Sequence, residues 1–374
     1  MKKRRVAILL NDMNAAGGIQ RVAANLTRDL SQKYDTMLLS VEPLQNPVFF
    51  SDDLEFNSLE FSRRAQTRQA FIYELFRAGK RLRQYVIEKK IDTVLAIWYD
   101  WAVVAALALP RHVKTIGCEH IDFAEASRSW QWIRRYAYPR LDAVVGLTQD
   151  AYPSLEKISR SAYVIPNSVS MPSTSSDNNR EKILLTVGHL ISRKGIDRLL
   201  WALKGPLHSH PDWKLAIVGG GEKSHIDWGY MDYLATLINI LQLNNRVNFY
   251  PATEKIDEWY KRASLYVMGS RQEGLPMVLL EAKAHGLPIV CFDCPTGPKD
   301  IVRNGIDGFL IQNCSNEFGD AAETLMSDGQ LWQEMSKAAL KDVKDRFSSE
   351  AITEKWYGLI ELLHQEKNAV AFNG

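Results

Sequence analysis

Short runs of aliphatic and β-branched residues alternate with segments of helical periodicity, and this alternation constrains the fold more than any other feature. Runs with few polar residues suit strands buried on both faces, and a helix between successive strands allows parallel pairing. The first series contains Val6 to Leu10, Asp35 to Ser40, Thr93 to Ile97, Thr115 to Cys118, Ala143 to Leu147 and Ala162 to Ile165. The second contains Ile183 to Val187, Leu215 to Val218, Val247 to Phe249, Leu265 to Met268 and Pro288 to Phe292. We therefore expect an α/β protein with two Rossmann-like domains.

A polar tract from Met171 to Glu181 separates the two series and lacks any apolar period, which is typical of a linker. A chain of 374 residues also exceeds the size at which one core usually keeps growing. We expect an N-terminal domain over 1–172, a C-terminal domain over 173–346 and a terminal helix over 347–374. That helix is expected to pack back on the N-terminal domain through a stripe formed by Trp356, Leu359, Ile360 and Leu363.

Charge and hydropathy exclude several classes of protein. A net charge of only +2 argues against a nucleic-acid binder. The first half is nevertheless basic, because residues 1–170 hold 24 Lys and Arg against 18 Asp and Glu. The longest uncharged apolar segment, Trp101 to Leu109, is shorter than the roughly 18 residues that cross a bilayer. The run Val6 to Leu10 is too short for a signal peptide, so we expect a cytoplasmic protein.

Two carboxylates flank a glycine-proline turn in Glu273-Gly-Leu-Pro-Met-Val-Leu-Leu-Glu281. Pro276 suits the first position of a helix, so the amides of roughly Leu275 to Val278 would point out of a helix N-terminus and favour an anionic or hydroxyl-rich ligand. A carboxylate can accept from both hydroxyls of a diol, so the two glutamates could hold a hexose and a ribose at opposite ends of a diphosphate. The alternative is one solvent-facing glutamate on the helix and another on the loop.

Glycine-rich turns follow two of the strand-like runs. Gly17 and Gly18 would let the backbone approach a diphosphate at a helix N-terminus, although a tight strand-to-helix turn needs the same residues. The absence of a GxGxxG fingerprint disfavours a dehydrogenase. The turn Ile217-Val-Gly-Gly-Gly221 could equally be a loop or a ligand cradle. We assign the nucleotide base to this region, with the residues Gly219, Gly220, Tyr250 and Pro251.

Cations and a histidine follow other strand-like runs. In Thr186-Val-Gly188-His189-Leu-Ile-Ser-Arg193-Lys194-Gly195, adjacent cations at the carboxyl edge of a sheet could neutralise a departing diphosphate. The alternative is a solvated basic loop. Cys118-Glu119-His120 also ends a strand; a single histidine is more often structural, but this position favours contact with a ligand. The lone Cys291-Phe-Asp-Cys294 has no second ligand pair, and no Asp-x-Asp triplet is present, so we expect no metal.

These motifs together resemble retaining glycosyltransferase family four, of GT-B architecture, over nearly the whole chain. The motifs that carry the resemblance are Gly17-Gly18, His120, Val164-Ile-Pro-Asn167, Gly188 to Gly195, Ile217 to Gly221, Asn245-Arg-Val-Asn-Phe249, Glu273-Gly-Leu-Pro with Glu281, and Asn304-Gly-Ile-Asp-Gly308-Phe-Leu. The resemblance implies two parallel sheets that face each other across an interdomain cleft, where a UDP-sugar binds as co-substrate without any other cofactor. One departure concerns His189, where members of the family often carry arginine. Either His189 contributes in its protonated form, or Arg193 substitutes for the arginine, or stabilisation of the leaving group rests mainly on Lys194.

The resemblance also implies roles for single residues. Lys194 would bind the diphosphate, Glu281 the ribose, and Glu273 the sugar, while His120 would lie near the reacting sugar's hydroxyls. The expected catalytic residues are Glu273, Lys194, His120 and Arg193. The expected donor-binding residues are Gly17, Gly18, His189, Gly274, Leu275, Pro276, Met277, Val278 and Glu281.

The acceptor is expected to be a lipid-linked glycan of lipopolysaccharide, O-antigen or capsule synthesis. Nine cations interleave with aromatic and aliphatic residues between Phe61 and Lys90, and Trp130-Gln-Trp132-Ile-Arg-Arg-Tyr136 adds interfacial residue types. We therefore expect peripheral binding to the anionic inner face of the cytoplasmic membrane; solvated helix faces are the alternative. Other functions that the sequence allows are a GT-B sugar-nucleotide epimerase or hydrolase and a noncatalytic sugar-nucleotide-binding partner.

Overall fold

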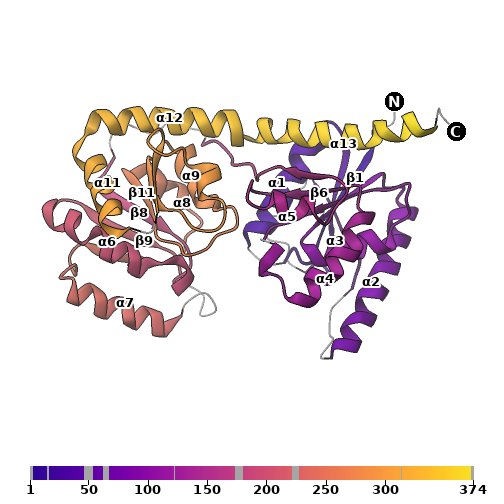
Figure 1. Cartoon of the computed structure of the whole chain (residues 1–374), viewed down its shortest axis with the longest axis horizontal. Helices are drawn as coiled ribbons and strands as arrows, with labels where there is room; N and C mark the ends of the chain where they lie inside the picture. Colours follow the sequence, from indigo (N-terminus) through magenta and orange to yellow (C-terminus); the bar gives the residue numbers. More distant parts are fainter. Residues whose placement is uncertain are drawn as a thin grey trace. The chain divides into compact units, whose positions relative to one another are not determined.

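The computed structural model describes residues 3–14, 17–45, 54–61, 67–121, 123–172, 180–220, 227–312 and 314–371. The chain forms two compact units (Figure 1), of which the first comprises Met1–Ser168 with Ser349–Gly374 and the second Val169–Ser348. Each unit is a parallel sheet with helices on its faces, so the prediction of two Rossmann-like domains is confirmed.

The first unit contains a sheet with the strand order β3-β2-β1-β4-β5-β6-β7, in which all neighbours pair in parallel. Its strands are β1 (Arg5–Leu10), β2 (Asp35–Ser40), β3 (Glu55–Ser58), β4 (Thr93–Ile97), β5 (Lys114–Cys118), β6 (Ala143–Gly146) and β7 (Ala162–Val164). Sequence analysis missed β3 because this short edge strand, Glu-Phe-Asn-Ser, lacks an aliphatic run. The order reverses between β1 and β4, and ligands of such sheets bind at this kind of reversal.

Helices cover both faces of the first sheet. Side chains alternate along β1, so Val6 and Ile8 enter one core cluster and Ala7 and Leu9 enter the other. On the first face lie α1 (Gly18–Ser31) and α13 (Ser349–Ala371), whose Trp356 is buried in that cluster. The other helices of this unit are α2 (Arg68–Glu88), α3 (Tyr99–Ala108), η1 (Phe123–Glu125), α4 (Arg128–Ala137), η2 (Tyr138–Arg140) and α5 (Tyr152–Glu156).

The second unit contains a parallel sheet with the strand order β10-β9-β8-β11-β12-β13. Its strands are β8 (Ile183–Val187), β9 (Lys214–Val218), β10 (Val247–Tyr250), β11 (Leu265–Met268), β12 (Ile289–Phe292) and β13 (Gly308–Ile311). Sequence analysis read the segment of β13 only as part of a motif. Gly308 lets this strand approach β12, since a Cβ there would meet the carbonyl oxygen of Ile289.

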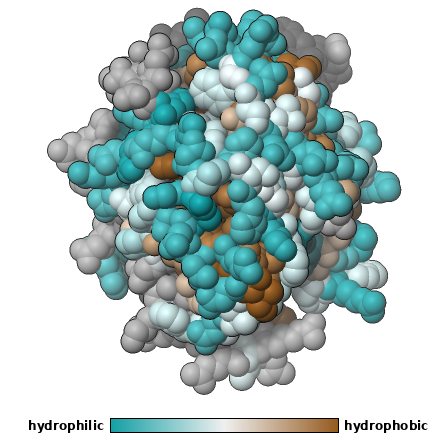
Figure 2. Space-filling model, turned by 90° about the vertical axis from the view of Figure 1, so that its left-hand side faces the viewer, coloured by the Kyte–Doolittle hydropathy of each residue, from teal (hydrophilic) through white to brown (hydrophobic). Residues whose placement is uncertain are grey.

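The helices of the second unit are η3 (Ser192–Lys194), α6 (Ile196–Ser209), α7 (Trp228–Ile240), α8 (Ile256–Arg262), α9 (Met277–Ala284), α10 (Pro298–Ile301), α11 (Ser315–Ser327) and α12 (Gly329–Phe347). Side chains of α6, α7 and α11 form one core cluster with the sheet, while α9 packs against α12. Figure 2 shows a face of this unit that is mainly hydrophilic, with a hydrophobic strip in its lower half and smaller hydrophobic patches near its upper edge.

Candidate active site

The loops that follow β8 and β11 meet at the carboxyl edge of the second sheet, where its strand order reverses. They touch through their backbones: Gly195 has a φ of 62°, and a Cβ on it would collide with the carbonyl oxygen of Gly269. A Cβ on Gly269 would in turn collide with the carbonyl oxygen of Gly195. Because both positions require glycine, the two loops are held together at the place where parallel sheets bind ligands.

Lys194 and Glu273, one from each loop, form an ion pair in which Nζ lies 2.7 Å from Oε1. Ser270 donates from Oγ to the same carboxylate oxygen over 2.6 Å. The Glu273 side chain is only 9% exposed and that of Lys194 16%. Both residues line a small pocket with Ser270, Gly188, Val278 and other residues of the same loops. The site thus holds a cation and a carboxylate that are largely screened from water.

The backbone of Glu273 is fixed by the loop after β12. The amide of Glu273 donates to the carbonyl of Pro295 over 2.8 Å, and the amide of Thr296 donates back to the carbonyl of Glu273 over 2.8 Å. The Thr296 hydroxyl donates to the carbonyl of Gly274 over 3.1 Å. Gly297, at a φ of 93°, could not carry a side chain there without striking the Gly274 oxygen. Residues Pro295 to Gly297 therefore position the loop that carries Glu273.

The first turn of α6 holds the same loop from the other side. Arg271 forms a bidentate pair with Asp197, with distances of 2.9 and 2.6 Å, and also donates to the carbonyl of Ser192. Arg198 donates to the carbonyls of Gly269 and Ser270 over 3.3 and 3.2 Å. Planar guanidinium groups suit such paired contacts, so these arginines fix the loop geometry.

Helix α9 begins directly after Glu273-Gly-Leu-Pro. Pro276 precedes the first helical residue, Met277, so the prediction of Pro276 at the first helical position was wrong by one residue. Its ψ of 95° is extended rather than helical, which makes it the N-cap. The first amides of α9 have no carbonyl partner within the helix and favour an anion at this end.

Glu281 lies about one turn along α9 and is held by the phenol of Tyr260. The Tyr260 hydroxyl donates to Glu281 Oε2 over 2.9 Å. The Tyr260 ring stacks on the His285 ring with centroids 5.1 Å apart, and His285 Nδ1 lies 2.8 Å from the Glu281 carbonyl. The orientation of the Glu281 carboxylate therefore depends on a residue 21 positions earlier in the chain.

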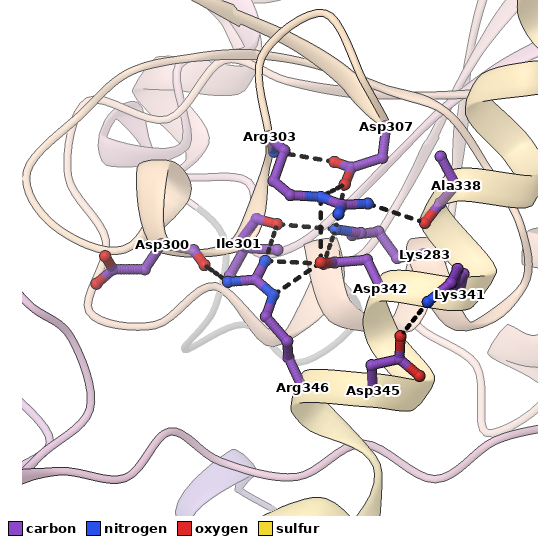
Figure 3. A network of polar contacts seen from close by, with 10 residues as sticks. All are labelled: Lys283, Asp300, Ile301, Arg303, Asp307, Ala338, Lys341, Asp342, Asp345 and Arg346. Atoms are coloured by element: carbon purple, nitrogen blue, oxygen red, sulfur yellow. Dashed lines mark hydrogen bonds and ion pairs between the residues drawn. The ribbon is translucent and has the colours of Figure 1, made fainter.

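A buried ionic network anchors the far end of α9 (Figure 3). Lys283 is fully buried and pairs with Asp307 over 3.0 Å and with Asp342. Asp342 also accepts from Arg346 over 2.7 Å, while Arg303 donates to Asp307 over 2.6 Å. Burial alone would raise the pKa of Asp342, but hydrogen bonds and ion pairs from Arg346 and Lys283 hold it below its usual value. The network ties α9 to α12 and to the turn before β13.

The predicted base region lies beside the β8 loop. Gly188 donates to the carbonyl of Val218 over 2.9 Å, and Gly219 donates to the carbonyl of Tyr250 over 3.0 Å. The Tyr250 ring lies 4.4 Å from that of Trp259. The structure thus brings together Gly219, Gly220, Tyr250 and Pro251 at the ends of β9 and β10. Gly221 lies outside the described residues.

The first unit presents the remaining predicted residues at the carboxyl edge of its own sheet. Gly17 caps α1, and Gly18 begins it. His120 follows β5 and lines an apolar pocket with Ile165 and Trp356, and these surroundings lower its pKa to about 4. Its neighbour Glu119 is structural, because it pairs with the fully buried Arg134 over 2.8 Å.

Two family models cover most of the chain. "Glycosyltransferase Family 4" matches residues 16–171, and "Glycosyl transferases group 1" matches residues 172–342. An uncharacterized glycosyltransferase of Haemophilus influenzae is 30% identical over 96% of this chain and 100% of its own length.

The chain belongs to glycosyltransferase family four.

Other relatives of this glycosyltransferase have named products or acceptors. The amylovoran biosynthesis glycosyltransferase AmsD of Erwinia amylovora is 30% identical over 95% of this chain and 99% of its own. A Campylobacter jejuni α-1,4-N-acetyl-D-galactosaminyltransferase, named for a diNAcBac-PP-undecaprenol substrate, is 24% identical over 98% of this chain and 99% of its own. The crystal structure of Anabaena HepE in complex with UDP has the same GT-B fold, with a TM-score of 0.80 at 17% identity over 96% of this chain and 99% of that one.

In this glycosyltransferase the predicted residues of the second unit gather at one sheet edge, but their exposure differs. Lys194 and Glu273 meet, whereas His189 and Arg193 are exposed on the same loop. Sequence analysis missed Ser270, Tyr260, Arg198, and the Asp197–Arg271 pair. Among the described residues, no group of three or more His, Cys, Asp or Glu side chains could hold a metal ion.

Proposed function

We propose that this glycosyltransferase moves a hexose or an N-acetylhexosamine from a UDP-sugar to a lipid-linked glycan, with retention of the anomeric configuration. The observation that carries the proposal is the Lys194–Glu273 pair, held at 2.7 Å beside the N-terminus of α9. A diphosphate requires a cation, and sugar hydroxyls require fixed acceptors. Both are supplied here in a largely buried setting, where electrostatic interactions are stronger than in water.

Donor binding would exchange the partners of Lys194. A bound diphosphate competes with Glu273 for the ammonium group. Glu273 then accepts hydrogen bonds from the sugar hydroxyls, and the backbone amides of Gly274, Leu275, Met277 and Val278 donate to oxygen atoms of the donor. Glu281, oriented by Tyr260, accepts the ribose hydroxyls. Exposed His189 and Arg193 add positive charge on the same loop. The base lies against residues Gly219, Gly220, Tyr250 and Pro251.

We assign two groups of the first unit to the same reaction. Gly17 and Gly18 serve the phosphate, because the first helical amides of α1 follow them directly. His120 serves the hydroxyls of the reacting sugar. Its lowered pKa makes it a neutral imidazole near pH 7, which can donate one hydrogen bond and accept another.

For the chemical step we propose an ion-pair mechanism, in which the acceptor attacks the sugar on the same face from which the diphosphate leaves. The bond between C1 and the β-phosphate oxygen breaks, and the acceptor oxygen forms its bond to C1 on the same face. The acceptor's proton passes to the leaving phosphate oxygen, so no carboxylate nucleophile and no divalent metal is required. Lys194 stabilises the charge that develops on the diphosphate. A covalent sugar trapped on an Asp or Glu would contradict this mechanism.

The glycan acceptor is proposed from the relatives and from the surface of the first unit. AmsD is named for amylovoran biosynthesis and the Campylobacter enzyme for a polyprenol-linked substrate. No described helix combines the length and apolar character required to span a bilayer. Exposed residues of α2 and α4 include the aromatics Tyr73, Phe76, Trp132 and Tyr136 and several arginines. We therefore propose peripheral binding to the inner face of the cytoplasmic membrane, in lipopolysaccharide, O-antigen or capsule synthesis.

The proposal is tested by a screen of sugar nucleotides for release of UDP or GDP, with and without extracted lipid-linked acceptors. We expect UDP release from one donor that depends on the acceptor and is lost in Lys194→Ala. Release without an acceptor would instead indicate a hydrolase or epimerase. Donor binding without any turnover would indicate a noncatalytic partner, and either result contradicts the proposal.

A further inference from the structure

An apolar groove lies on the first unit between α2, α3 and α4, whose ribbons Figure 1 shows on the same side of that unit. Its apolar lining includes Ile72, Leu75, Phe76, Val103, Val104, Leu107, Trp130 and Ile133. Its volume of about 840 Å³ falls within the range of roughly 300–1,000 Å³ that is usual for ligand sites. Exposed apolar residues are ordinarily scattered singly, so a continuous groove of this size indicates an apolar partner.

The wall formed by α2 is polar at one end only. Its groove residues recur at helical spacing, with Ile72, Leu75 and Phe76 in the first half and Lys80 and Arg83 in the second. Arg83 donates to the carbonyl of Ala108 over 3.0 Å, at the C-terminal end of α3. One end of the groove therefore suits hydrocarbon and the other suits an anionic group.

Gly79 keeps α2 close to α3 at the middle of the groove. A Cβ on Gly79 would come within 3.1 Å of the Ala108 Cβ, closer than most side chains pack. The helices are thus near enough to make a narrow floor, while the exposed Leu107 and Ile133 form the margins. A narrow apolar floor fits a single unbranched chain better than a protein surface.

The helices α2 and α4 also carry exposed aromatic residues of the types found at lipid headgroups. Tyr73, Trp132 and Tyr136 are 62%, 75% and 62% exposed. Arg140 lies over the Tyr136 ring with its guanidinium carbon 4.4 Å from the centroid. Among the side chains that the structure describes, the exposed cations of α2 and α4 are Arg77, Lys80, Arg81, Arg83, Arg128 and Arg135. Aromatics and cations spread over two helices fit the extended anionic surface of a bilayer.

We propose that the groove binds one acyl chain of an anionic bilayer phospholipid, with its phosphate at Lys80 and Arg83. Phe76 then lies against the acyl chain at the apolar end of the groove, and Trp132 and Tyr136 lie at the headgroup level. This inference rests on the proposed membrane association and narrows it to a defined lipid site. The lipid comes from the bilayer and is distinct from the lipid that carries the glycan acceptor.

Photo-crosslinking tests the site directly. The full chain is mixed with vesicles that contain phosphatidylglycerol bearing a diazirine in its acyl chain, and crosslinked peptides are mapped by mass spectrometry. We expect labelling of α2, α3 and α4 at groove residues. Leu107→Gln should lower this labelling about tenfold, since it removes most of the burial energy of one leucine. Its control, Ile240→Gln, changes another exposed aliphatic residue, which belongs to the second unit, and should leave labelling unchanged.

The charged end is tested by headgroup exchange and by Lys80→Gln, with the exposed Lys204→Gln of α6 as control. We expect a neutral phosphatidylcholine probe to label the groove more weakly than the phosphatidylglycerol probe does. We also expect Lys80→Gln to weaken labelling and Lys204→Gln to leave it unchanged. Equal labelling by both headgroups, labelling spread over the whole surface, or preferential labelling by a polyprenyl phosphate probe would overturn the inference. Sugar transfer in detergent micelles separates the two proposals. Leu107→Gln should transfer sugar as well as the unmodified chain does. If the unmodified chain transfers no sugar, that result contradicts the proposed function and leaves the lipid site untouched.

Discussion

Lys194 Nζ and Glu273 Oε1 lie 2.7 Å apart although 79 positions separate the two residues in the chain. They meet because β8 and β11 are neighbours at the point where the strand order of the second sheet reverses. Ser270 donates to the same carboxylate oxygen, so Glu273 is held in place before any ligand arrives. A site with its charges fixed in advance needs little rearrangement during the reaction.

Removal of the Lys194 ammonium should slow turnover more than it weakens binding. For Lys194→Ala we expect kcat to fall about 10²- to 10³-fold, the usual effect of losing one preorganised group at a developing charge. Arg193→Ala and His189→Ala should each have a smaller effect, because both side chains are exposed. Steady-state kinetics of the three variants measure these effects, and thermal melting serves as the control for folding. A larger loss in Arg193→Ala would transfer the leaving-group role to Arg193.

Tyr260 should act as a positioning residue for donor binding. Tyr260→Phe removes the 2.9 Å hydrogen bond to Glu281 but keeps the ring on His285, so we expect KM for the donor to rise about three- to tenfold with kcat nearly unchanged. Glu281→Ala should raise KM further. Tyr233→Phe on α7, which alters an exposed phenol of the same unit, serves as the control. A fall in kcat at unchanged KM would contradict a role in ribose binding.

Loss of one acid from the Lys283 network should destabilise the second unit. Asp342→Asn leaves the buried Lys283 with one carboxylate, and we expect a loss of about 3–5 kcal/mol in the free energy of unfolding. Asp345→Asn is the matched control on the same helix (Figure 3). Its pair with Lys341 is exposed, so its loss should stay within roughly 0.5 kcal/mol. Similar effects in guanidinium unfolding of the two variants would contradict the anchoring role.

The stability of the first unit should depend on pH through His120. Its pKa is lowered from 6.5 to about 4 in the folded chain, so the unfolded chain takes up the proton first as pH falls. Stability from this residue is therefore complete above about pH 6.5 and declines between pH 6.5 and 4. His120→Gln should flatten that decline. A His120 NMR resonance that titrates between pH 6 and 7 would contradict the lowered pKa on which this prediction depends.

The sequence was sufficient for the architecture because strands buried on both faces of a sheet are almost continuously apolar. It was insufficient for β3, whose polar residues lie at a sheet edge. It was also insufficient for β13, which begins at Gly308, where close packing against β12 leaves no room for a side chain. Lys194, Glu273 and Glu281 were found through their place after strands or at a helix start. Tyr260, Ser270 and Arg198 were missed, since a hydrogen bond between distant loops leaves no periodic signal.

The same limit applies to the histidine and the glutamate that follow β5. The sequence favoured ligand contact for His120 and assigned no role to Glu119. In the structure Glu119 turns into the core to meet Arg134, and His120 lines a pocket at the sheet edge. Which of the two neighbouring side chains enters the core depends on α4, whose buried Arg134 lies 15 positions after Glu119. Only the folded chain reveals that pairing.

A crystal structure of the chain soaked with UDP tests the central claim most directly. We expect the diphosphate within hydrogen-bond distance of Lys194 Nζ, the ribose hydroxyls on Glu281, and the Lys194–Glu273 contact lengthened beyond 2.7 Å. Nucleotide bound away from the β8 and β11 loops, with the Lys194–Glu273 pair unchanged, would contradict the proposed donor site.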